Sequence, residues 1–410
     1  MKQENNIQPI RVGVIGLGQR GPGLLEGVIL KMEQVIVTAI CDLYPDRMEA
    51  AAKMIQDKNG YIPACVADYH DVLNREDVDA VVIVSSWQEH VRMACDAMRA
   101  HKAVACEVGG ACSIEECWDL VHTHEETQTP IMMLENCCYG RNELMLLNMV
   151  QLGVLGEIIH CRGGYCHDLR DEISFGRENR HYRLEHYCKR NCENYPTHEI
   201  GPIAKILNIG HGNRMLTLHS VASKSCGLNT YLQREKGEEY DLTKRAFAQG
   251  DVVTTVIKCA NGETIQITLE TTLPRPYSRQ LEVHGTKGLY MEDNQSLFLD
   301  GIHNEFDFTW TDQWNNIEQL RDEYEHPIWK QYIKDGVQGG HDGMDWLALR
   351  DFFDCIRTGR PMPIDVYDMA AWMSITPLSE ESIATGQTVS MPDFTGGRWM
   401  KEQKTMYPIE

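Results

Sequence analysis

Almost continuously apolar runs alternate with amphipathic stretches over the first third of the chain. The runs are residues 11–15, 35–42, 80–86, 102–107 and 130–136. Between them, apolar residues recur at helical spacing. Runs of this kind are typical of strands buried on both faces, and their alternation with helices indicates a parallel sheet. We therefore predict an α/β fold whose first domain, residues 1–137, contains a doubly wound parallel sheet.

From residue 138 onward the pattern changes to alternation with a period of two. The segments 252–260 and 264–272 are joined through Asn261-Gly262, a dipeptide that favours a tight β-hairpin turn. This alternating pattern predicts a second α/β domain over residues 138–410, built on a large, mostly antiparallel, open sheet.

Helices and irregular segments complete the second half of the chain. Two late helices are expected at about 341–358, ended by Gly359, and at 366–386. Residues 170–195 and 305–340 are aromatic, charged and without clear periodicity. Long segments of this kind usually cover a binding site.

Composition narrows the classes of function. The 410 residues include 39 Lys+Arg and 60 Asp+Glu, so the net charge is 39 − 60 = −21, which argues against a nucleic-acid or anionic-membrane partner. No run of eighteen apolar residues predicts a membrane span, and the start MKQENNIQPI lacks the apolar core of a secretory signal. The fifteen cysteines are scattered, which predicts buried thiols in a reducing compartment rather than disulfides. We expect a cytoplasmic protein.

A glycine-rich motif follows the first apolar run. Gly16, Gly18 and Gly21 form Gly-x-Gly-x-x-Gly between a strand and a helix, and Asp42 ends the next strand. This is the context of a dinucleotide-binding fingerprint, in which glycines admit a pyrophosphate at a helix N-terminus. Asp42 would bind ribose hydroxyls and repel a 2′-phosphate, which predicts NAD as the cofactor. The alternative is a turn without ligand, with Asp42 as a helix cap.

With this motif, the chain resembles the Gfo/Idh/MocA oxidoreductase superfamily, in which a Rossmann domain precedes an α/β domain that binds substrate and mediates oligomerisation. Members usually end the fifth strand with Glu-Lys-Pro, where the lysine serves catalysis, but this chain has Glu107-Val108-Gly109. Four long strings closely resemble glycoside hydrolase family 109, the NAD-dependent α-N-acetylgalactosaminidases: residues 132–150, 163–170, 194–209 and 273–279.

Two positions depart from the pattern of family 109. Gly109-Gly110 replaces Pro-Ala, and Glu199 replaces a glycine after His198. Both lie near the expected site, so the preferred sugar stays open.

The resemblance implies a set of site residues in each domain. For the cofactor they are Gly16, Gly18, Gln19, Arg20, Gly21, Asp42, Trp87, Gln88, Glu89, His90, Glu107, Val108 and Asn136. For the sugar they are Tyr165, Arg183, Tyr195, Pro196, Thr197, His198 and Tyr277. No metal is expected, since the spacing of Cys188, Cys192, His181 and His186 matches no zinc motif.

The residues themselves leave room for plainer interpretations. Tyr165 could be a core aromatic residue, although His167 and Asp168 make its strand end polar. Arg183 could belong to a solvated basic loop rather than bind sugar hydroxyls. We expect Thr197 to cap a helix whose first turn holds His198, where the helix dipole favours a neutral ring that can accept a proton.

Glycoside hydrolysis usually needs two carboxylates, but NAD-dependent enzymes are an exception. The resemblance implies transient oxidation at sugar C3, loss of the C2 proton, elimination, water addition and reduction. Tyr165, His198 and Tyr195 are the candidate catalytic residues, and Tyr165 and His198 could exchange steps. Two alternatives are an NAD-dependent sugar or inositol dehydrogenase and a non-catalytic nucleotide-bound sensor. By analogy, a homo-oligomer that acts on a small-molecule glycoside is expected.

Overall fold

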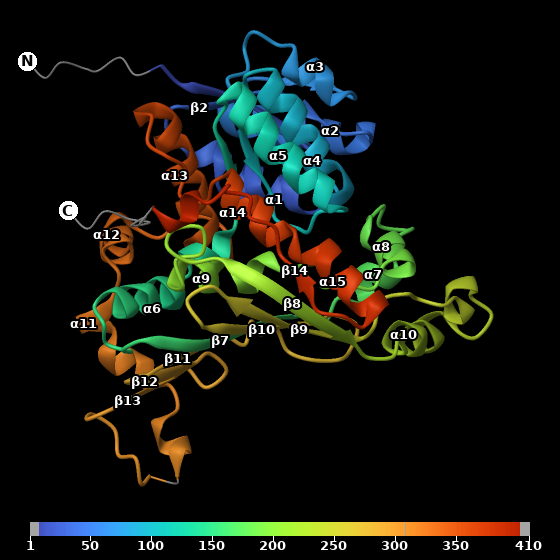
Figure 1. Ribbon diagram of the computed structural model, residues 1–410. Helices are drawn as coiled ribbons and strands as arrows, with labels where there is room; N and C mark the ends of the chain where they lie inside the picture. The colour runs from blue at the N-terminus through green and yellow to red at the C-terminus, as the bar shows by residue number, and fades with distance from the viewer. Residues whose placement is uncertain (1–7, 308, 402–410) are drawn as a thin grey trace, which may run out of the picture. The chain divides into compact units, whose positions relative to one another are not determined.

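The apolar runs of the first third form a six-stranded parallel sheet in a computed structural model, which describes residues 8–307 and 309–401 (Figure 1). Its order is β3-β2-β1-β4-β5-β6. The strands are β1 (Ile10–Ile15), β2 (Val35–Cys41), β3 (Ala64–Val66), β4 (Ala80–Ile83), β5 (Ala103–Cys106) and β6 (Ile131–Met133). The predicted doubly wound sheet is confirmed, and its order reverses between β1 and β4, where such sheets bind ligands.

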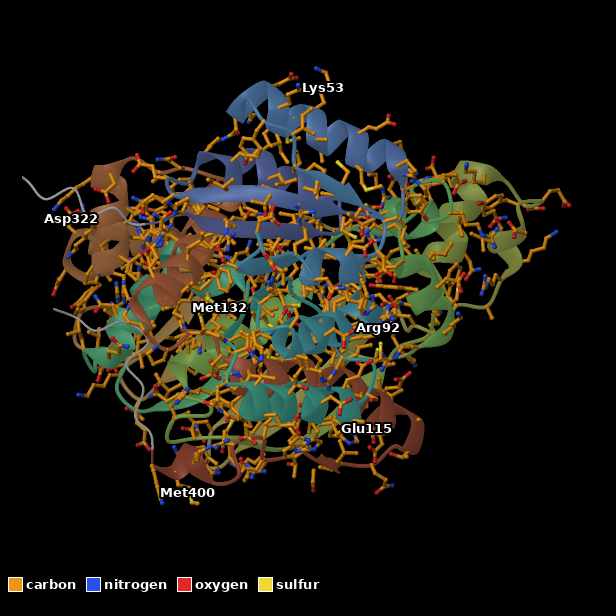
Figure 2. The ribbon with its side chains drawn as sticks, turned by 90° about the horizontal axis from the view of Figure 1, so that it is seen from above. Lys53, Arg92, Glu115, Met132, Asp322 and Met400 are labelled. Atoms are coloured by element: carbon orange, nitrogen blue, oxygen red, sulfur yellow. The ribbon has the colours of Figure 1, made fainter. Side chains whose placement is uncertain are left out.

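Helices connect these strands. They are α1 (Arg20–Gly27), α2 (Pro45–Asn59), α3 (Tyr69–Leu73), α4 (Trp87–Arg99) and α5 (Ile114–Thr127). The residues of β4 and β5 are all buried, as their apolar runs predict. Lys53 on α2 points away from the protein, whereas Met132 of β6 is fully buried (Figure 2).

Packing divides the chain into two units. The first unit comprises the residues up to Val108, Glu115–Tyr139 and Tyr332–Ala370, and the second comprises Gly109–Ile114, Gly140–Gln331 and the residues from Ala371 onward. This differs from the cut expected at 137/138 in three segments, 109–114, 138–139 and 332–370, each of which packs with the other half of the chain. The domain boundary itself stays a prediction.

The late helix α13 (Met344–Thr358) belongs to the first unit and ends at Gly359, which has a left-handed backbone, as predicted. The single helix expected at 366–386 is wrong. The structure has α14 (Val366–Met373) and α15 (Ile375–Thr385) instead, separated at Ser374. Pro377 lacks the N–H that would continue the hydrogen-bond ladder across this point, which explains the break.

The second unit is built on an eight-stranded sheet with the order β13-β12-β11-β7-β10-β9-β8-β14. Neighbours are antiparallel except for the parallel pair β7 and β10, so the predicted mostly antiparallel sheet is confirmed. The strands are β7 (Ile158–Cys166), β8 (Met215–Ala222), β9 (Val252–Cys259), β10 (Thr264–Glu270), β11 (Glu282–Gly285), β12 (Gly288–Met291), β13 (Ser296–Leu299) and β14 (Val389–Ser390). The predicted hairpin is β9 and β10.

Three helices of the second unit, α6 (Arg141–Gln151), α9 (Thr197–Ile206) and α15, lie on one face of this sheet (Figure 1). The segments expected to be irregular contain short helices: α7 (Arg170–Ser174), α8 (Arg183–Lys189), α11 (Arg321–Tyr324) and α12 (Pro327–Asp335). One more helix, α10 (Gly227–Lys236), follows β8. Among the described residues, no helix is long and apolar enough to cross a membrane.

Candidate active site

The glycine-rich loop between β1 and α1 packs directly on the carboxyl end of β4. Gly16 has a φ of 99°, and a Cβ atom there would lie 2.5 Å from the backbone oxygen of Val84. A Cβ at Gly21 would lie 2.4 Å from the oxygen of Gly16. Only glycine fits these two positions, and the loop presents the start of α1 as a pyrophosphate site requires.

Asp42 follows β2 and is buried beside this loop. Its Oδ2 accepts a hydrogen bond from the Leu17 N–H at 2.7 Å, and its Oδ1 accepts one from the Tyr44 N–H at 2.9 Å. The residue that precedes α2 is Tyr44, so the helix-cap alternative for Asp42 is wrong. A carboxylate has about four acceptor sites, so ribose hydroxyls can still bind to it.

The four candidate residues 87–90 form the first turn of α4, which follows β4. Burial lowers the pKa of His90 to about 4, so its ring is neutral, and its Nε2 lies 3.0 Å from the backbone oxygen of Ser85. The Nδ1 of His90 and the Oγ of Ser85 are buried and have no hydrogen-bond partner among the described residues. Buried polar atoms in this condition are costly, so a polar ligand such as NAD fits this edge of the sheet.

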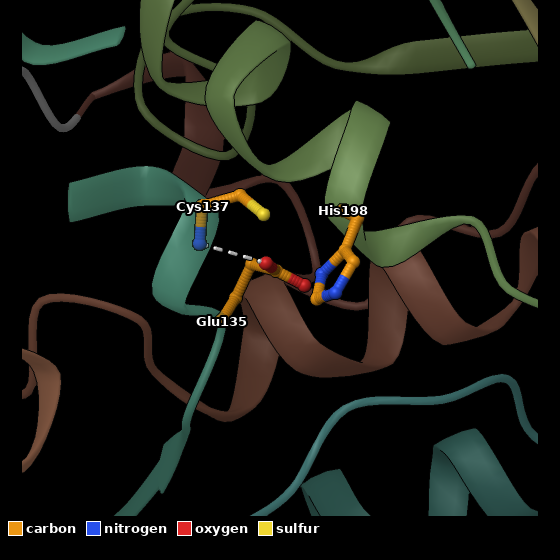
Figure 3. Close-up of side chains that lie close together, drawn as sticks. All are labelled: Glu135, Cys137 and His198. Carbon is orange, nitrogen blue, oxygen red and sulfur yellow. Dashed lines mark hydrogen bonds between the residues drawn. The ribbon is translucent and has the colours of Figure 1, made fainter. Parts of the chain in front are cut away.

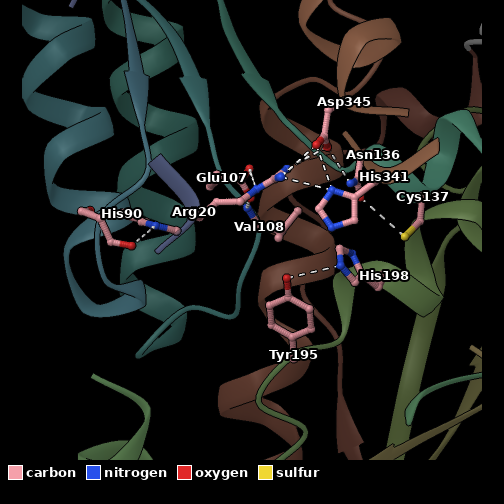
Figure 4. Close-up of polar contacts among 11 residues, drawn as sticks. Arg20, His90, Glu107, Val108, Asn136, Cys137, Tyr195, His198, His341 and Asp345 are labelled. Carbon is pink, nitrogen blue, oxygen red and sulfur yellow. Dashed lines mark hydrogen bonds and ion pairs between the residues drawn. The ribbon is translucent and has the colours of Figure 1, made fainter. Parts of the chain in front are cut away.

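Arg20 is the centre of a charged network in the first unit (Figure 4). Its Nε donates to Glu107 Oε1 at 2.9 Å, and its two Nη atoms donate to Asp345 at 2.7 and 2.8 Å. Asn136 Nδ2 donates to Asp345 Oδ1 at 2.8 Å, and His341 Nδ1 lies 2.8 Å from Asp345 Oδ2. The network joins the predicted residues Arg20, Glu107 and Asn136.

The charges of this network stabilise one another. Burial disfavours the charge of Arg20, yet Glu107 and Asp345 raise its pKa above the ordinary value. Burial likewise disfavours the charge of Asp345, yet hydrogen bonds from Arg20 and His341 hold its pKa well below the ordinary value. Because two carboxylates hold the Arg20 side chain, a contact with the pyrophosphate would use its backbone N–H at the start of α1.

Asp345 and His341 are site residues that sequence reasoning missed. They lie in the string GGHDGMDW at residues 339–346, which is part of the family likeness but carries no chemical motif of its own. Next to Asn136, the N–H of Cys137 donates to Glu135 Oε1 at 3.1 Å, which fixes the turn after β6 (Figure 3). The Glu135 side chain is fully buried.

In the second unit, the structure brings together four of the predicted sugar-binding residues. The ring centroid of Tyr165 lies 4.4 Å from that of Tyr195, 5.5 Å from His198 and 6.3 Å from Tyr277. Tyr195 Oη lies 3.4 Å from His198 Nε2 (Figure 4). Tyr165 comes from the end of β7 and Tyr277 from the segment after β10. Tyr195 lies just before α9, and His198 lies in the first turn of α9.

Arg183 is buried against this cluster rather than exposed in a basic loop. Its guanidinium lies 5.3 Å from the ring centroid of Tyr195, and its Nη1 lies 3.1 Å from Glu172 Oε1. Burial disfavours its charge, yet Tyr182, Tyr165 and Glu172 raise its pKa above the ordinary value. The solvated interpretation of Arg183 is therefore wrong.

The start of α9 differs from expectation at Thr197. The residue before the helix is Pro196, whose φ of −74° and ψ of −16° already suit a helix, so Thr197 is the first helical residue rather than the cap. His198 lies in the first turn, as predicted. The Oγ1 of Thr197 is buried and has no hydrogen-bond partner among the described residues, which fits a ligand hydroxyl at this position.

His167 is a neighbour of Tyr165 that was not assigned to the site. Its Nδ1 lies 3.1 Å from Tyr165 Oη, and its ring centroid lies 5.1 Å from that of Tyr277. The spacing of two residues along a strand is the signal that could have indicated it, because such side chains share a face.

The departures from the family pattern have local structural reasons. Gly109 has a φ of 149°, which proline cannot adopt, and a Cβ at Gly110 would lie 1.9 Å from Thr376 Oγ1. Glu199 is buried, and a Cβ at Gly163 would lie 2.9 Å from the Cβ of Glu199. Gly163 thus makes room for Glu199 where α9 packs on β7.

Comparison with known protein families matches both parts of the chain. Residues 139–401 match the model "Glycosyl hydrolase 109, C-terminal domain". Residues 10–134 match "Oxidoreductase family, NAD-binding Rossmann fold", in agreement with the glycine loop and Asp42, so this region is an NAD-binding domain.

Two solved structures that share this fold are dehydrogenases. A levoglucosan dehydrogenase in complex with NADH and L-sorbose has a TM-score of 0.70 at 19% identity, covering 94% of this chain and 100% of the other. A myo-inositol 2-dehydrogenase from Lactobacillus plantarum has a TM-score of 0.66 at 16% identity, with the same coverage. These likenesses confirm the fold.

Relatives of known family match over nearly the full length. A glycosyl hydrolase family 109 protein of Stenotrophomonas maltophilia is 38% identical, covering 98% of this chain and 92% of the relative. An α-N-acetylgalactosaminidase of Tannerella forsythia is also 38% identical, covering 96% of this chain and 88% of the relative. Together with the match of residues 139–401, these relatives show that the chain belongs to glycosyl hydrolase family 109.

Proposed function

We propose that this enzyme is a glycosidase that acts on α-N-acetylgalactosaminides or related glycosides through transient oxidation of the sugar by bound NAD. The observation that carries the proposal is the cluster of Tyr165, Tyr195 and His198, which supplies phenols and imidazole where most glycosidases place two carboxylates. The nearby Glu172 forms an ion pair with Arg183, and Glu199 packs against Gly163 of β7. Acid–base work therefore falls to tyrosine and histidine.

The residues of the first unit hold the cofactor in this proposal. The glycine loop and the start of α1 bind the pyrophosphate, Asp42 binds the adenine ribose, and the α4 turn with Glu107, Val108 and Asn136 lines the nicotinamide end. When bound, NAD⁺ supplies an acceptor for the C3 hydride of the sugar and later returns that hydride.

The residues of the second unit move the protons and hold the sugar. His198 takes the proton of the O3 hydroxyl, and Tyr165 takes the proton of C2, which the C3 ketone acidifies. Tyr195 and Arg183 hold and polarise the sugar oxygens. The aglycone then leaves, and water adds to C1. Exchange of the roles of His198 and Tyr165 would leave this order of steps unchanged.

A panel of aryl glycosides tests the proposal. Phenol release and the absorbance of reduced nicotinamide are followed together, and the product formed in D₂O is analysed for deuterium at C2. Phenol release without net NADH, with label at C2, supports the proposal. Stoichiometric NADH would favour a sugar or inositol dehydrogenase instead, and the absence of both signals with every sugar would favour a nucleotide-bound sensor.

A homo-oligomer is a further part of the proposal. The neighbouring strands β8 and β9 expose Val221 and Val256 on one face of the eight-stranded sheet, where they are 55% and 46% exposed. Exposed apolar residues gathered on a sheet are typical of contact surfaces. Analytical ultracentrifugation tests this prediction, and a monomer at micromolar concentration would contradict it.

A further inference from the structure

Tyr165 and His167 form a pair that the sheet itself positions. They lie two residues apart at the end of β7, so their side chains share a face. Tyr165 Oη lies 3.1 Å from His167 Nδ1, and the rings meet edge to face at 5.8 Å and 86°. The N–H of His167 donates to the backbone oxygen of Glu270 on β10 at 3.0 Å, which continues the β7–β10 ladder. The pair is therefore held by strand pairing.

Tyr165 needs a proton acceptor to act as a base. Burial raises the pKa of Tyr165 to about 12, although the charge of Arg183 and a hydrogen bond from it lower the pKa. At neutral pH the phenol therefore keeps its proton. It can take a proton from carbon only if its own proton passes to another group at the same time.

His167 is suited to receive that proton. Burial lowers the pKa of His167, and the charge of Arg183 lowers it further. The ring is therefore neutral at neutral pH, and its Nδ1 accepts a hydrogen bond when Nε2 carries the ring proton.

The groups around His167 leave it in this neutral state. Arg183 on α8 and His198 on α9 lower its pKa, while Glu172 on α7 and the adjacent Asp168 oppose this effect. Arg170 engages both oxygens of Asp168, at 2.8 and 2.7 Å. The ring of Tyr277 packs edge to face against the ring of His167, with the centroids 5.1 Å apart.

We propose that His167 is the proton acceptor behind Tyr165, so that the two form a relay for the C2 proton of the sugar. His167 acts through Tyr165 and not on the sugar itself, and this inference rests on the proposed function. The C2–H bond breaks as an Oη–H bond forms, and the original phenol proton moves to Nδ1. The electron pair of C2 becomes a C1=C2 double bond as the C1–O bond breaks, and the aglycone leaves with that bonding pair and takes a proton from solvent.

Addition of water reverses the relay. As the oxygen of water bonds to C1 and one proton of that water goes to solvent, the electron pair of the C1=C2 bond takes the phenol proton at C2. The proton on Nδ1 returns to Tyr165, so no proton is gained or lost by the pair. The pair of Tyr195 and His198, at 3.4 Å, stands beside the relay, since the rings of the two tyrosines lie 4.4 Å apart. Each of the two proton-transfer steps then has its own tyrosine–histidine pair.

The relay is tested with an aryl 3-ketoglycoside, which enters the reaction after the hydride step. The NAD⁺-loaded enzyme should release phenol from it by C2 deprotonation and elimination. In His167→Gln, whose amide cannot take up the proton, release should fall by roughly 10²–10⁴-fold, the usual contribution of a positioned base. From the parent glycoside, the same variant should still form NADH in a single turnover within a few-fold of the unmodified rate, and that NADH should accumulate. The matched control is His284→Gln, because His284 lies on β11 beside His160 and Glu282.

The pH profile separates a relay from structural support. In the unmodified enzyme, elimination of the 3-ketoglycoside should rise with pH until His167 is neutral and then level off. In His167→Gln the rate should keep rising with pH toward the pKa of Tyr165, about 12. If His167→Gln is unstable, His167→Ala is the second test variant. Added imidazole should restore elimination in His167→Ala.

Several outcomes would overturn the relay. These are elimination by His167→Gln at the unmodified rate, an equal loss of NADH formation and elimination, an unchanged pH profile, or no rescue of a folded His167→Ala by imidazole. Failure of the proposed function is a different result, because the unmodified enzyme would then release no phenol from the parent glycosides, with or without stoichiometric NADH.

Discussion

The glycine loop of the first unit and the cluster of tyrosine and histidine rings in the second unit use different chemical groups. The first uses backbone atoms that only glycine can expose, next to a network of Arg20, Glu107 and Asp345. The second uses the side chains of Tyr165, Tyr195, His167 and His198, packed ring against ring. A ligand of permanent charge can be held by fixed dipoles and ion pairs, whereas proton transfer needs groups that can change their charge.

The pKa shifts follow the same division. Mutual stabilisation raises the pKa of Arg20 and lowers that of Asp345, so both stay charged at any working pH. In the second unit, burial raises the pKa of Tyr165 and lowers that of His167, so both start neutral. Substitutions in the first unit should therefore change binding, and substitutions in the second should change turnover.

The largest effect is expected for Tyr165→Phe. Loss of the phenol should slow hydrolysis of the best aryl glycoside by roughly 10²–10⁴-fold, the range for a positioned acid or base, and leave NAD affinity unchanged. Steady-state kinetics and calorimetric NAD titration measure the two quantities. Tyr290→Phe, which alters a buried phenol on β12, is the control and should keep full activity. A loss of NAD affinity in Tyr165→Phe as large as its loss of turnover would contradict the division of cofactor binding and turnover between the two units.

Gly16→Ala should act on the cofactor instead. Its Cβ would lie 2.5 Å from the backbone oxygen of Val84, at a φ of 99° that costs alanine about 1–3 kcal/mol, so the loop must move. The dissociation constant for NAD should rise about tenfold or more, where each tenfold corresponds to about 1.4 kcal/mol. In Gly23→Ala the new Cβ meets nothing within 4 Å, so binding should not change. Unaltered NAD affinity in Gly16→Ala would contradict the proposal that the glycine loop binds the pyrophosphate of NAD.

Asp42→Asn should have a smaller effect on the same ligand. The amide oxygen can still accept the Leu17 N–H, but the amide nitrogen cannot accept the Tyr44 N–H. Loss of the charge and of this hydrogen bond should weaken NAD binding by about 1–3 kcal/mol. The preference for NAD over NADP should narrow in parallel titrations with the two cofactors. Asp57→Asn, at an exposed ion pair with Lys53 on α2, is the control. Equal affinity of the unmodified enzyme for both cofactors would contradict the role of Asp42.

The smallest effect is expected for Glu193→Gln, which concerns stability. Glu193 is fully buried in the second unit, and burial raises its pKa to about 8, although a hydrogen bond from the Tyr195 backbone lowers it. Because this folded-state pKa lies above the unfolded value of about 4.3, the stability that Glu193 contributes is complete below pH ~4.3 and is lost as pH rises toward 8.

In Glu193→Gln this loss should be absent. Between pH 5 and 8 the melting temperature of the variant should fall less than that of the unmodified protein. The difference should be roughly 2–4 °C for each kcal/mol of stability that the unmodified protein loses through Glu193. Scanning calorimetry measures the difference, and Glu239→Gln, at a fully solvated position, should follow the unmodified protein. Identical pH dependence of Glu193→Gln and the unmodified protein would show that Glu193 does not titrate in this range.

Much of the architecture could be predicted because it depends on local patterns. The apolar runs predict the parallel strands, and alternation around Asn261-Gly262 predicts the hairpin, since the side-chain period and turn chemistry belong to neighbouring residues. The glycine motif and Asp42 predict the cofactor loop for the same reason. The long strings shared with family 109 indicated both the family and the candidate sugar-binding residues.

Only the tertiary structure decided which distant groups meet. Asp345 reaches Arg20 across 325 positions of sequence, and no local pattern can specify such a pairing. Burial of Arg183 and the division of the late helix at Ser374 likewise depend on what packs around them. His167 lay beside Tyr165 in the sequence from the start, but only strand geometry and the 3.1 Å contact make the two a pair. Periodicity specifies which face of an element is apolar, whereas the pKa of a group and its partners depend on the burial and charges that folding brings to it.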